Sequence, residues 1–211
     1  MNYPLFTAPE IYLKTRQGTV GFTYFKQIGE RWALDRCVAM LSAVKSVCDA
    51  PCGYGTLFSY WSKKGFQVVG VDLSKPMVTE ARDELSRVSL SGNVLYGDIF
   101  SLSGLLKERV DLVACVRFIY YFEKTRRVKL LKELAAASNH YVLVQYKTTG
   151  TYRGKVRSSE ADRKGERQSK YFCSFEQIRE ELREAGLSNI RIVPISQFSD
   201  RVFVIGEKTC V

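Results

Sequence analysis

The sequence predicts an open α/β fold, because strand-like and helix-like segments alternate along a chain of 211 residues. Two short apolar runs end in Asp49 and Asp72, and a small-residue turn and a helix-like segment separate them. This pattern is typical of the opening βαβ unit of a parallel sheet. Ligands of such sheets bind outside the carboxyl ends of the strands, at the switch in strand order. A carboxylate at the end of the second strand suits ribose hydroxyls, so we expect a ligand built on a nucleoside.

The remaining elements follow in alternation, without internal repeats. Gln67–Asp72 reads as the second strand, and Ser74 is expected to cap a helix that runs to about Val88, with Pro76 in its first turn. Gly186 is expected to close the last helix. The other expected elements are strands at Asn93–Asp98, Asp111–Arg117 and His140–Lys147, helices at Lys124–Ser138 and Phe175–Ala185, and a final hairpin of Ile190–Ile195 and Arg201–Gly206.

Composition indicates one globular domain that carries no membrane span. A chain of 211 residues, 45% hydrophobic and 26% charged, suits one full α/β domain and is short for two. No apolar run approaches the roughly 20 residues that cross a bilayer, and the start lacks the pattern of a secretory signal. The six cysteines contain no C-x-x-C pair, so we expect neither a metal site nor a disulfide framework. We expect reduced thiols in a cytoplasmic protein, at positions 37, 48, 52, 115, 173 and 210.

The turn after the first strand reads Asp49-Ala50-Pro51-Cys52-Gly53-Tyr54-Gly55. It is acidic at its start, and Pro51 removes a backbone donor, so the turn suits a pyrophosphate poorly and a cationic ligand, such as an ammonium group, better. Gly53 and Gly55 allow a tight turn and a close approach to a ligand. The turn resembles motif I of the class I, Rossmann-like S-adenosylmethionine (SAM)-dependent methyltransferases, in a small-molecule-type variant with Pro-Cys-Gly in place of the first Gly-x-Gly.

This resemblance implies a three-layer αβα sandwich around a seven-stranded, mostly parallel sheet of order 3-2-1-4-5-7-6, whose last strand is antiparallel. It also implies SAM as the cofactor and S-adenosylhomocysteine (SAH) as the product. Asp72 matches the acid that binds both ribose hydroxyls, and Asp98 matches the residue that accepts from the adenine amino group. The implied cofactor site comprises Asp49, Ala50, Pro51, Cys52, Gly53, Gly55, Asp72, Leu73, Met77, Asp98, Ile99, Val116 and Arg117.

Candidates for catalysis and for contact with the acceptor are few. Tyr120 and Tyr121 stand where many small-molecule methyltransferases carry two histidines, and they could orient a substrate, relay a proton or simply pack. The single histidine, His140, begins the fifth strand and should lie at the opposite edge. We therefore expect catalysis mainly by proximity and in-line alignment. The candidate acceptor contacts are Tyr24, Tyr146, Lys147 and Arg153.

Positive charge is concentrated between the fifth strand and the last helix. The formal net charge is +10, and residues 147–170 contain eight Lys or Arg against three Asp or Glu. This polar stretch shows no clear period, so we expect a lid-like loop over an anionic acceptor; a solvated basic loop is the alternative. The expected parts are a helical cap (1–45), a cofactor-binding core (46–146), the basic loop, and a C-terminal helix and hairpin (171–211).

Three functions fit these observations. The resemblance implies methyl transfer to an oxygen or nitrogen atom of a small molecule or of a sugar- or lipid-linked conjugate. A pI near 9.3 favours nucleic acid as a second candidate partner, and so an RNA methyltransferase. The third function is a non-catalytic SAM-binding or scaffold protein, because a fold alone does not prove turnover. The sequence does not set the oligomeric state.

Overall fold

The structure, a computed structural model, describes residues 20–88, 92–163 and 170–209, and for residues 20–27 it describes the backbone alone. Its strands form one seven-stranded sheet in the order β3-β2-β1-β4-β5-β7-β6, as the sequence predicted. Strand β7 is antiparallel to both of its neighbours, and the strands from β3 to β5 are parallel. The strands are β1 (Ser46–Asp49), β2 (Gln67–Asp72), β3 (Gly92–Tyr96), β4 (Val110–Cys115), β5 (Ser138–Lys147), β6 (Leu187–Pro194) and β7 (Arg201–Lys208).

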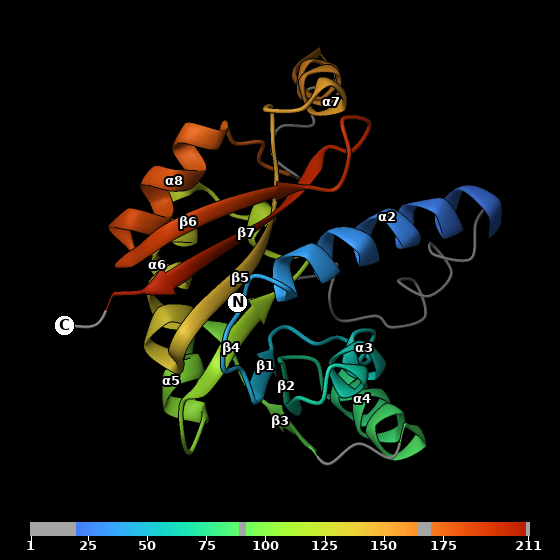
Figure 1. Cartoon of the computed structure of the whole chain (residues 1–211), viewed down its shortest axis with the longest axis vertical. Coiled ribbons are helices and arrows are strands. Elements are labelled where there is room, and N and C mark those ends of the chain that lie inside the picture. Colours follow the sequence, from blue (N-terminus) through green and yellow to red (C-terminus); the bar gives the residue numbers. More distant parts are fainter. Residues whose placement is uncertain (1–19, 89–91, 164–169, 210–211) are drawn as a thin grey trace.

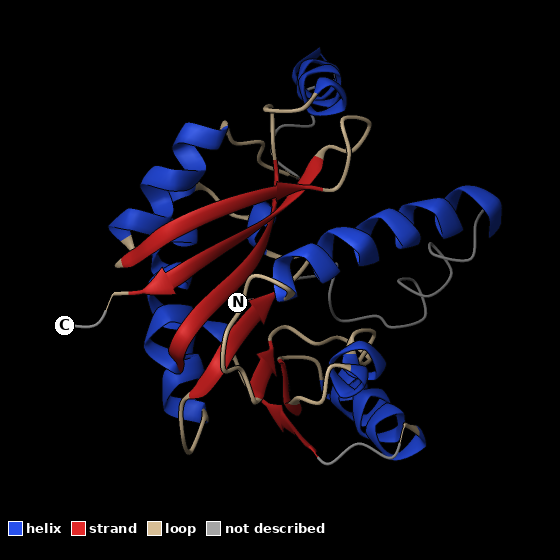
Figure 2. Ribbon diagram, viewed as in Figure 1, coloured by secondary structure: helices blue, strands red, loops and turns tan. Residues whose placement is uncertain are grey.

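Helices cover both faces of this sheet, which makes three layers (Figures 1 and 2). One face carries α2 (Val20–Val38), α3 (Phe58–Lys63) and α4 (Lys75–Arg87). The other face carries α5 (Leu102–Leu105), α6 (Lys124–Ala137) and α8 (Phe175–Glu184), while α7 (Tyr152–Arg163) lies beyond the end of β5. Two short 3₁₀ turns, η1 (Ile99–Ser101) and η2 (Ile119–Tyr121), follow β3 and β4.

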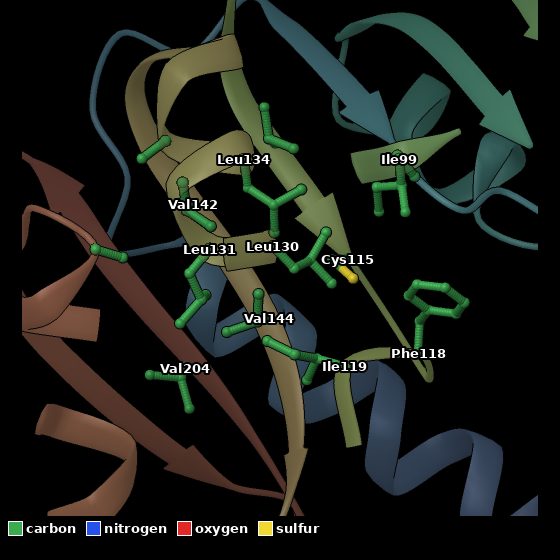
Figure 3. Close-up of a cluster of buried hydrophobic side chains, with 14 of the residues drawn as sticks. Ile99, Cys115, Phe118, Ile119, Leu130, Leu131, Leu134, Val142, Val144 and Val204 are labelled. Atoms are coloured by element: carbon green, nitrogen blue, oxygen red, sulfur yellow. The ribbon is translucent and has the colours of Figure 1, made fainter. Parts of the chain in front are cut away.

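Side-chain alternation along β4 divides the interior into two hydrophobic cores. Val113 and Cys115 join the core under α6 and α8, and Leu112 and Ala114 join the core under α2, α3 and α4. Successive strand residues point to opposite faces, so a strand covered on both sides reads as one apolar run. Figure 3 shows Cys115 in the first of these cores, near residues of α6 and β5. Among the described helices, none has the length and apolar character needed to cross a bilayer.

Boundaries differ from the expected ones by a few residues at most. Strand β3 ends at Tyr96, because the Asp98 carboxylate accepts a hydrogen bond from the Phe100 N–H at 3.0 Å and so begins η1. Within the expected helical cap (1–45), the helix α2 ends at Val38. Gly186 has the left-handed backbone, with φ of +80°, that ends α8.

The prediction of a lid-like basic loop is wrong for residues 152–163, which form the helix α7. The Thr151 hydroxyl accepts from the Gly154 N–H at 3.1 Å, and the Thr151 carbonyl accepts from the Lys155 N–H at 3.0 Å, which starts the helix. Most side chains of this helix are polar, so the hydrophobic period that reveals a helix in a sequence is weak here. Residues 164–169 of the expected loop lie outside the described residues.

Candidate active site

The turn after β1 is tied to the two neighbouring strands, β2 and β4, at the carboxyl edge of the sheet. The Cys52 N–H donates to the Val71 carbonyl of β2 at 2.9 Å, and the Ala50 N–H donates to the Ala114 carbonyl of β4 at 2.9 Å. Ala50 and Pro51 are joined by a cis peptide bond. The expected motif residues therefore form one fixed surface at the switch in strand order, where open α/β sheets bind ligands.

The two glycines of this turn have different structural roles. Gly53 has φ of +55°, and a Cβ atom placed on it would meet nothing within 4 Å, so open space lies in front of its backbone. Gly55 has φ of +80°, and its Cβ would lie 2.6 Å from the ring of buried Phe58. Gly53 thus offers bare backbone to a ligand, while Gly55 lets the turn pack against α3.

Asp72 links the turn to the end of β2. One carboxylate oxygen accepts from the Gly53 N–H at 2.9 Å, and the other accepts from the Ser74 N–H at 2.9 Å. Burial raises the pKa of Asp72 above its ordinary value, and these backbone donors oppose the rise. Each carboxylate oxygen keeps a further lone pair, so the group can still accept from two hydroxyls.

Asp49, at the end of β1, is 2% exposed, and burial raises its pKa to about 7. The indole N–H of Trp61 lies near enough to favour the ionised form, although it falls short of hydrogen-bond geometry. The Arg117 guanidinium acts in the same direction, and the Asp72 carboxylate acts against ionisation. A cation next to Asp49 would complete the charge balance of this buried acid.

The ends of β2 and β3 form the other part of the expected cofactor site. The Gly97 N–H donates to the Asp72 carbonyl at 3.0 Å, which holds Asp98 close to the end of β2. Leu73 is 41% exposed there, an apolar wall open to solvent. Met77 and Ile99 are buried, and Ile99 belongs to the core under α6 and α8.

Arg117, expected at the cofactor wall, binds a carboxylate of the cap helix. Its Nε and Nη2 atoms donate to Glu30 of α2 at 3.1 and 2.6 Å, and its backbone has φ of +61°. Glu30 also accepts from Gln145 Nε2 at 2.6 Å and from Arg201 Nη1 at 3.4 Å. Burial acts to raise the pKa of Glu30, but the two guanidinium groups outweigh it and hold that pKa below its ordinary value. This network fastens α2 to the ends of β4, β5 and β7.

Sequence reasoning missed Glu30, although a signal was present. Glu30 shares one helix face with Ala33, Leu34 and Cys37, at spacings of three, four and seven residues, and all three are buried. A single acid on an apolar helix face requires a buried partner.

A cavity of about 230 Å³ lies between α2, the turn after β1, and the ends of β4 and β7. It contains both charged and apolar side chains, so it can hold a molecule with a polar group on an apolar body. Val116 contributes to its wall. The lining residues are Glu30, Arg31, Leu34, Tyr54, Thr56, Leu57, Val116, Arg117 and Phe203.

The two candidate catalytic tyrosines lie in η2, with ring centroids 4.9 Å apart. Tyr120 is 5% exposed, and its carbonyl accepts from the Tyr171 N–H at 2.7 Å. Tyr121 is half-buried. Lys147 lies with its Nζ 5.8 Å from the Tyr120 ring and forms an ion pair with Asp200. Tyr120 thus packs, while Tyr121 keeps an exposed part at the carboxyl edge.

The other candidate acceptor contacts are dispersed. Tyr146 is fully buried and its hydroxyl donates to Glu181 of α8 at 2.9 Å, so it points into the core under α6 and α8 instead of toward the cavity. Arg153 is exposed on α7, and the side chain of Tyr24 lies outside the described residues. His140 Nε2 lies 3.9 Å from Asp111, before the middle of β5 and away from the carboxyl edge, as expected. Among the described residues, no group of three or more His, Cys, Asp or Glu is placed to hold a metal ion.

The strand order, the glycine turn after β1 and the acid at the end of β2 define the class I, Rossmann-like methyltransferase fold. Residues 47–140 match the family model described as a methyltransferase domain. The structure resembles the crystal structure of magnesium protoporphyrin IX methyltransferase from Synechocystis with bound SAH, with a TM-score of 0.70 at 20% identity over 91% of this chain and 90% of that one. It also resembles a SAM-dependent methyltransferase from Archaeoglobus fulgidus, with a TM-score of 0.66 at 14% identity over 94% and 98% of the two chains. At these identities the likeness establishes the fold.

Similar curated sequences are methyltransferases with different substrates. Magnesium-protoporphyrin O-methyltransferase of Synechocystis is 28% identical in an alignment of length 134 that covers 59% of this chain and 56% of the relative. Ribosomal RNA small subunit methyltransferase C of Alcanivorax borkumensis is 31% identical over 96 residues, which are 46% of this chain and 28% of the relative. The matches thus span from about a quarter to just over half of these relatives.

Proposed function

We propose that this protein is a SAM-dependent methyltransferase that methylates an oxygen or nitrogen atom of a small molecule or of a sugar- or lipid-linked conjugate. The observation that carries this proposal is the contact between the Asp72 carboxylate and the Gly53 N–H, beside open space at the switch in strand order. The carboxylate is held in place by backbone donors and keeps acceptor capacity for the hydroxyls of a ribose. The match of residues 47–140 to a methyltransferase domain supports the same reading.

Each part of a bound SAM molecule has a matching group on this edge. Asp72 would accept from the ribose hydroxyls, and Asp98 with exposed Leu73 would hold the adenine. Asp49 would face the cationic amino acid part, which favours its ionised form. Bare backbone at Gly53 allows close approach. SAM, when bound, supplies an activated methyl group, so the protein needs mainly to bind, align and exclude water.

The cavity beside Glu30 and Arg117 is the candidate acceptor site, because it adjoins the same turn and is lined by α2. Tyr121 stands at the carboxyl edge, where a hydroxyl could orient an acceptor or pass a proton from it. Tyr121→Phe would then lower turnover and leave SAM affinity unchanged. Unchanged turnover with a protonated acceptor would remove this residue from the mechanism.

The first test is calorimetric titration of SAM and SAH into the wild type and into Asp72→Asn, which keeps the shape of the side chain. We expect SAM to bind the wild type, and the variant to bind about 10- to 100-fold more weakly, since hydrogen bonds to charged groups contribute on the order of 1.5–3 kcal/mol. Asp83→Asn, on the exposed face of α4, is the matched control and should bind like the wild type. Absence of SAM binding to the folded wild type would refute the proposal.

A ribosomal RNA methyltransferase is the second candidate, because one relative with that activity is 31% identical over 96 residues and the net charge is +10. Basic character alone gives affinity for phosphates without base specificity. Transfer of labelled methyl groups from SAM to ribosomal RNA, compared with transfer to a low-mass extract, separates the two candidates.

A further inference from the structure

An exposed aromatic and basic surface lies where α7 meets the connection between β6 and β7. Phe198 is 81% exposed and Tyr152 is 67% exposed, the highest values among the large hydrophobic side chains that the structure describes. The Arg153 N–H donates to the Gln197 carbonyl at 3.1 Å, so the two rings project from adjacent segments. Figure 1 shows these segments side by side at one end of the molecule.

This arrangement is built into the fold. The Thr151 hydroxyl donates to the Ser199 carbonyl at 2.6 Å, and the Thr148 N–H donates to the Asp200 carbonyl at 2.9 Å. Gly154 is required at its position, because a Cβ there would lie 1.8 Å from the Thr148 carbonyl oxygen. Helix α7 is therefore seated on the end of β5, and the aromatic pair has a defined place.

The helix that carries Tyr152 also carries exposed cations. Arg153, Lys155 and Arg157 are exposed on the first two turns of α7, whose first turn contains no acidic residue. Arg163 lies eleven residues after Tyr152, three helical turns on, and so shares its face. We call Tyr152, Arg153, Lys155, Arg157 and Phe198 together the α7 surface.

We infer that the α7 surface binds the headgroup region of an anionic lipid bilayer. Aromatic side chains favour the boundary between water and hydrocarbon, and basic side chains beside them are attracted to lipid phosphates. The ring of Phe198 is apolar and exposed, so moving it from water into that boundary is favourable. RNA fits less well, since stacking platforms lie within a basic groove that follows the strand, whereas Phe198 stands on a projecting turn.

The position of this surface connects it with the candidate acceptor site. Strand β5 leads directly into α7, so the α7 surface lies at the same carboxyl edge as Asp49 and Asp72. If the proposed function holds, an acceptor linked to a lipid would reach the cavity from the bilayer. Binding to the bilayer itself needs no SAM, so a test of it stays independent of the proposed function.

The test is co-sedimentation of the purified full chain with vesicles made of equal parts phosphatidylglycerol and phosphatidylcholine, compared with vesicles of phosphatidylcholine alone. We expect binding to the anionic vesicles only. The triple variant Arg153→Gln, Lys155→Gln and Arg157→Gln should weaken it by roughly a hundredfold, because each basic residue near such a surface contributes about fivefold. The double variant Tyr152→Ser and Phe198→Ser should weaken it by roughly tenfold or more.

Matched controls remove the same groups from other surfaces. Lys124→Gln, Lys129→Gln and Lys132→Gln take three exposed charges from α6, and Tyr96→Ser takes an exposed ring from β3, the outermost strand on the side of the sheet away from β7 and β6. Both should bind vesicles like the wild type. Equal losses of vesicle affinity in test and control variants would overturn the inference. Unchanged vesicle affinity of the Tyr152→Ser and Phe198→Ser double variant would also overturn it. Absence of vesicle binding together with a gel shift of single-stranded RNA would assign the surface to RNA instead.

Discussion

The buried carboxyl of Asp49 should make the stability of the ligand-free protein depend on pH. Its pKa is about 7 in the folded protein and 3.8 for an ordinary aspartate. Between these values the folded protein holds a proton that the unfolded chain has released, so the free energy of unfolding falls as the pH rises from about 4 to about 7. One pKa unit corresponds to about 1.4 kcal/mol, which gives a loss on the order of 4 kcal/mol.

Asp49→Asn removes this proton uptake. We expect the difference in free energy of unfolding, variant minus wild type, to grow by up to about 4 kcal/mol across the same pH window and then to level off. The pKa of Asp72 is also raised, but both proteins keep that group, so its effect cancels to first order. Urea denaturation at a series of pH values measures the difference, with Asp83→Asn as a control on an exposed carboxylate. A difference that stays constant between about pH 4 and pH 8 would refute the reasoning.

Three further predictions concern packing and buried charge. Arg127→Met leaves Glu181, 1% exposed, without its cation and should lower the free energy of unfolding by about 3–5 kcal/mol; adding Glu181→Leu should restore most of it, and a double-mutant cycle without coupling would contradict this. Glu30→Gln removes the carboxylate charge that faces Arg117 and Arg201 and should cost about 2 kcal/mol by urea denaturation, less than for a deeper pair because the arginines are partly exposed. Gly70→Ala places a Cβ 2.6 Å from a buried ring and should cost about 1–3 kcal/mol, whereas Gly104→Ala, with open space around it, should leave the thermal midpoint unchanged or raised.

The strands of the parallel part could be located because each βα boundary carries its own local signal, whereas their order in the sheet could not. Apolar runs mark the buried strands, and Asp49 and Asp72 mark the carboxyl ends of the first two. The motif resemblance then supplied the topology. Helix α7 escaped prediction because its polar residues lack a period, and the cap at Thr151 was its one local signal. Its further contacts with the β6–β7 connection join residues that are distant in the sequence, so no local pattern contains them.

The acceptor side of the site was harder to predict. Successive residues of a strand point to opposite faces of the sheet, so a shift of one residue changes the face on which a side chain lies. Gln145 faces α2 and donates to Glu30, whereas its neighbour Tyr146 faces α8 and donates to Glu181. Both follow the same apolar run, so the sequence places them equally near the carboxyl edge. Only the face of the sheet to which each residue of β5 points decides whether it contacts Glu30 of α2 or lies in the core under α6 and α8.

The position of β7 also determines when this protein can complete its fold during synthesis. Strand β7 (Arg201–Lys208) is inserted between β5 and β6, and it brings Arg201 to Glu30, a residue made 171 positions earlier. The parallel strands up to β5 can pair as the chain emerges. Glu30 of α2, however, lacks one of its two guanidinium partners until Arg201 has been synthesised. The cap over the cavity therefore closes last, and a nascent chain stalled before β7 would expose both the edge of β5 and the apolar face of α2 to aggregation.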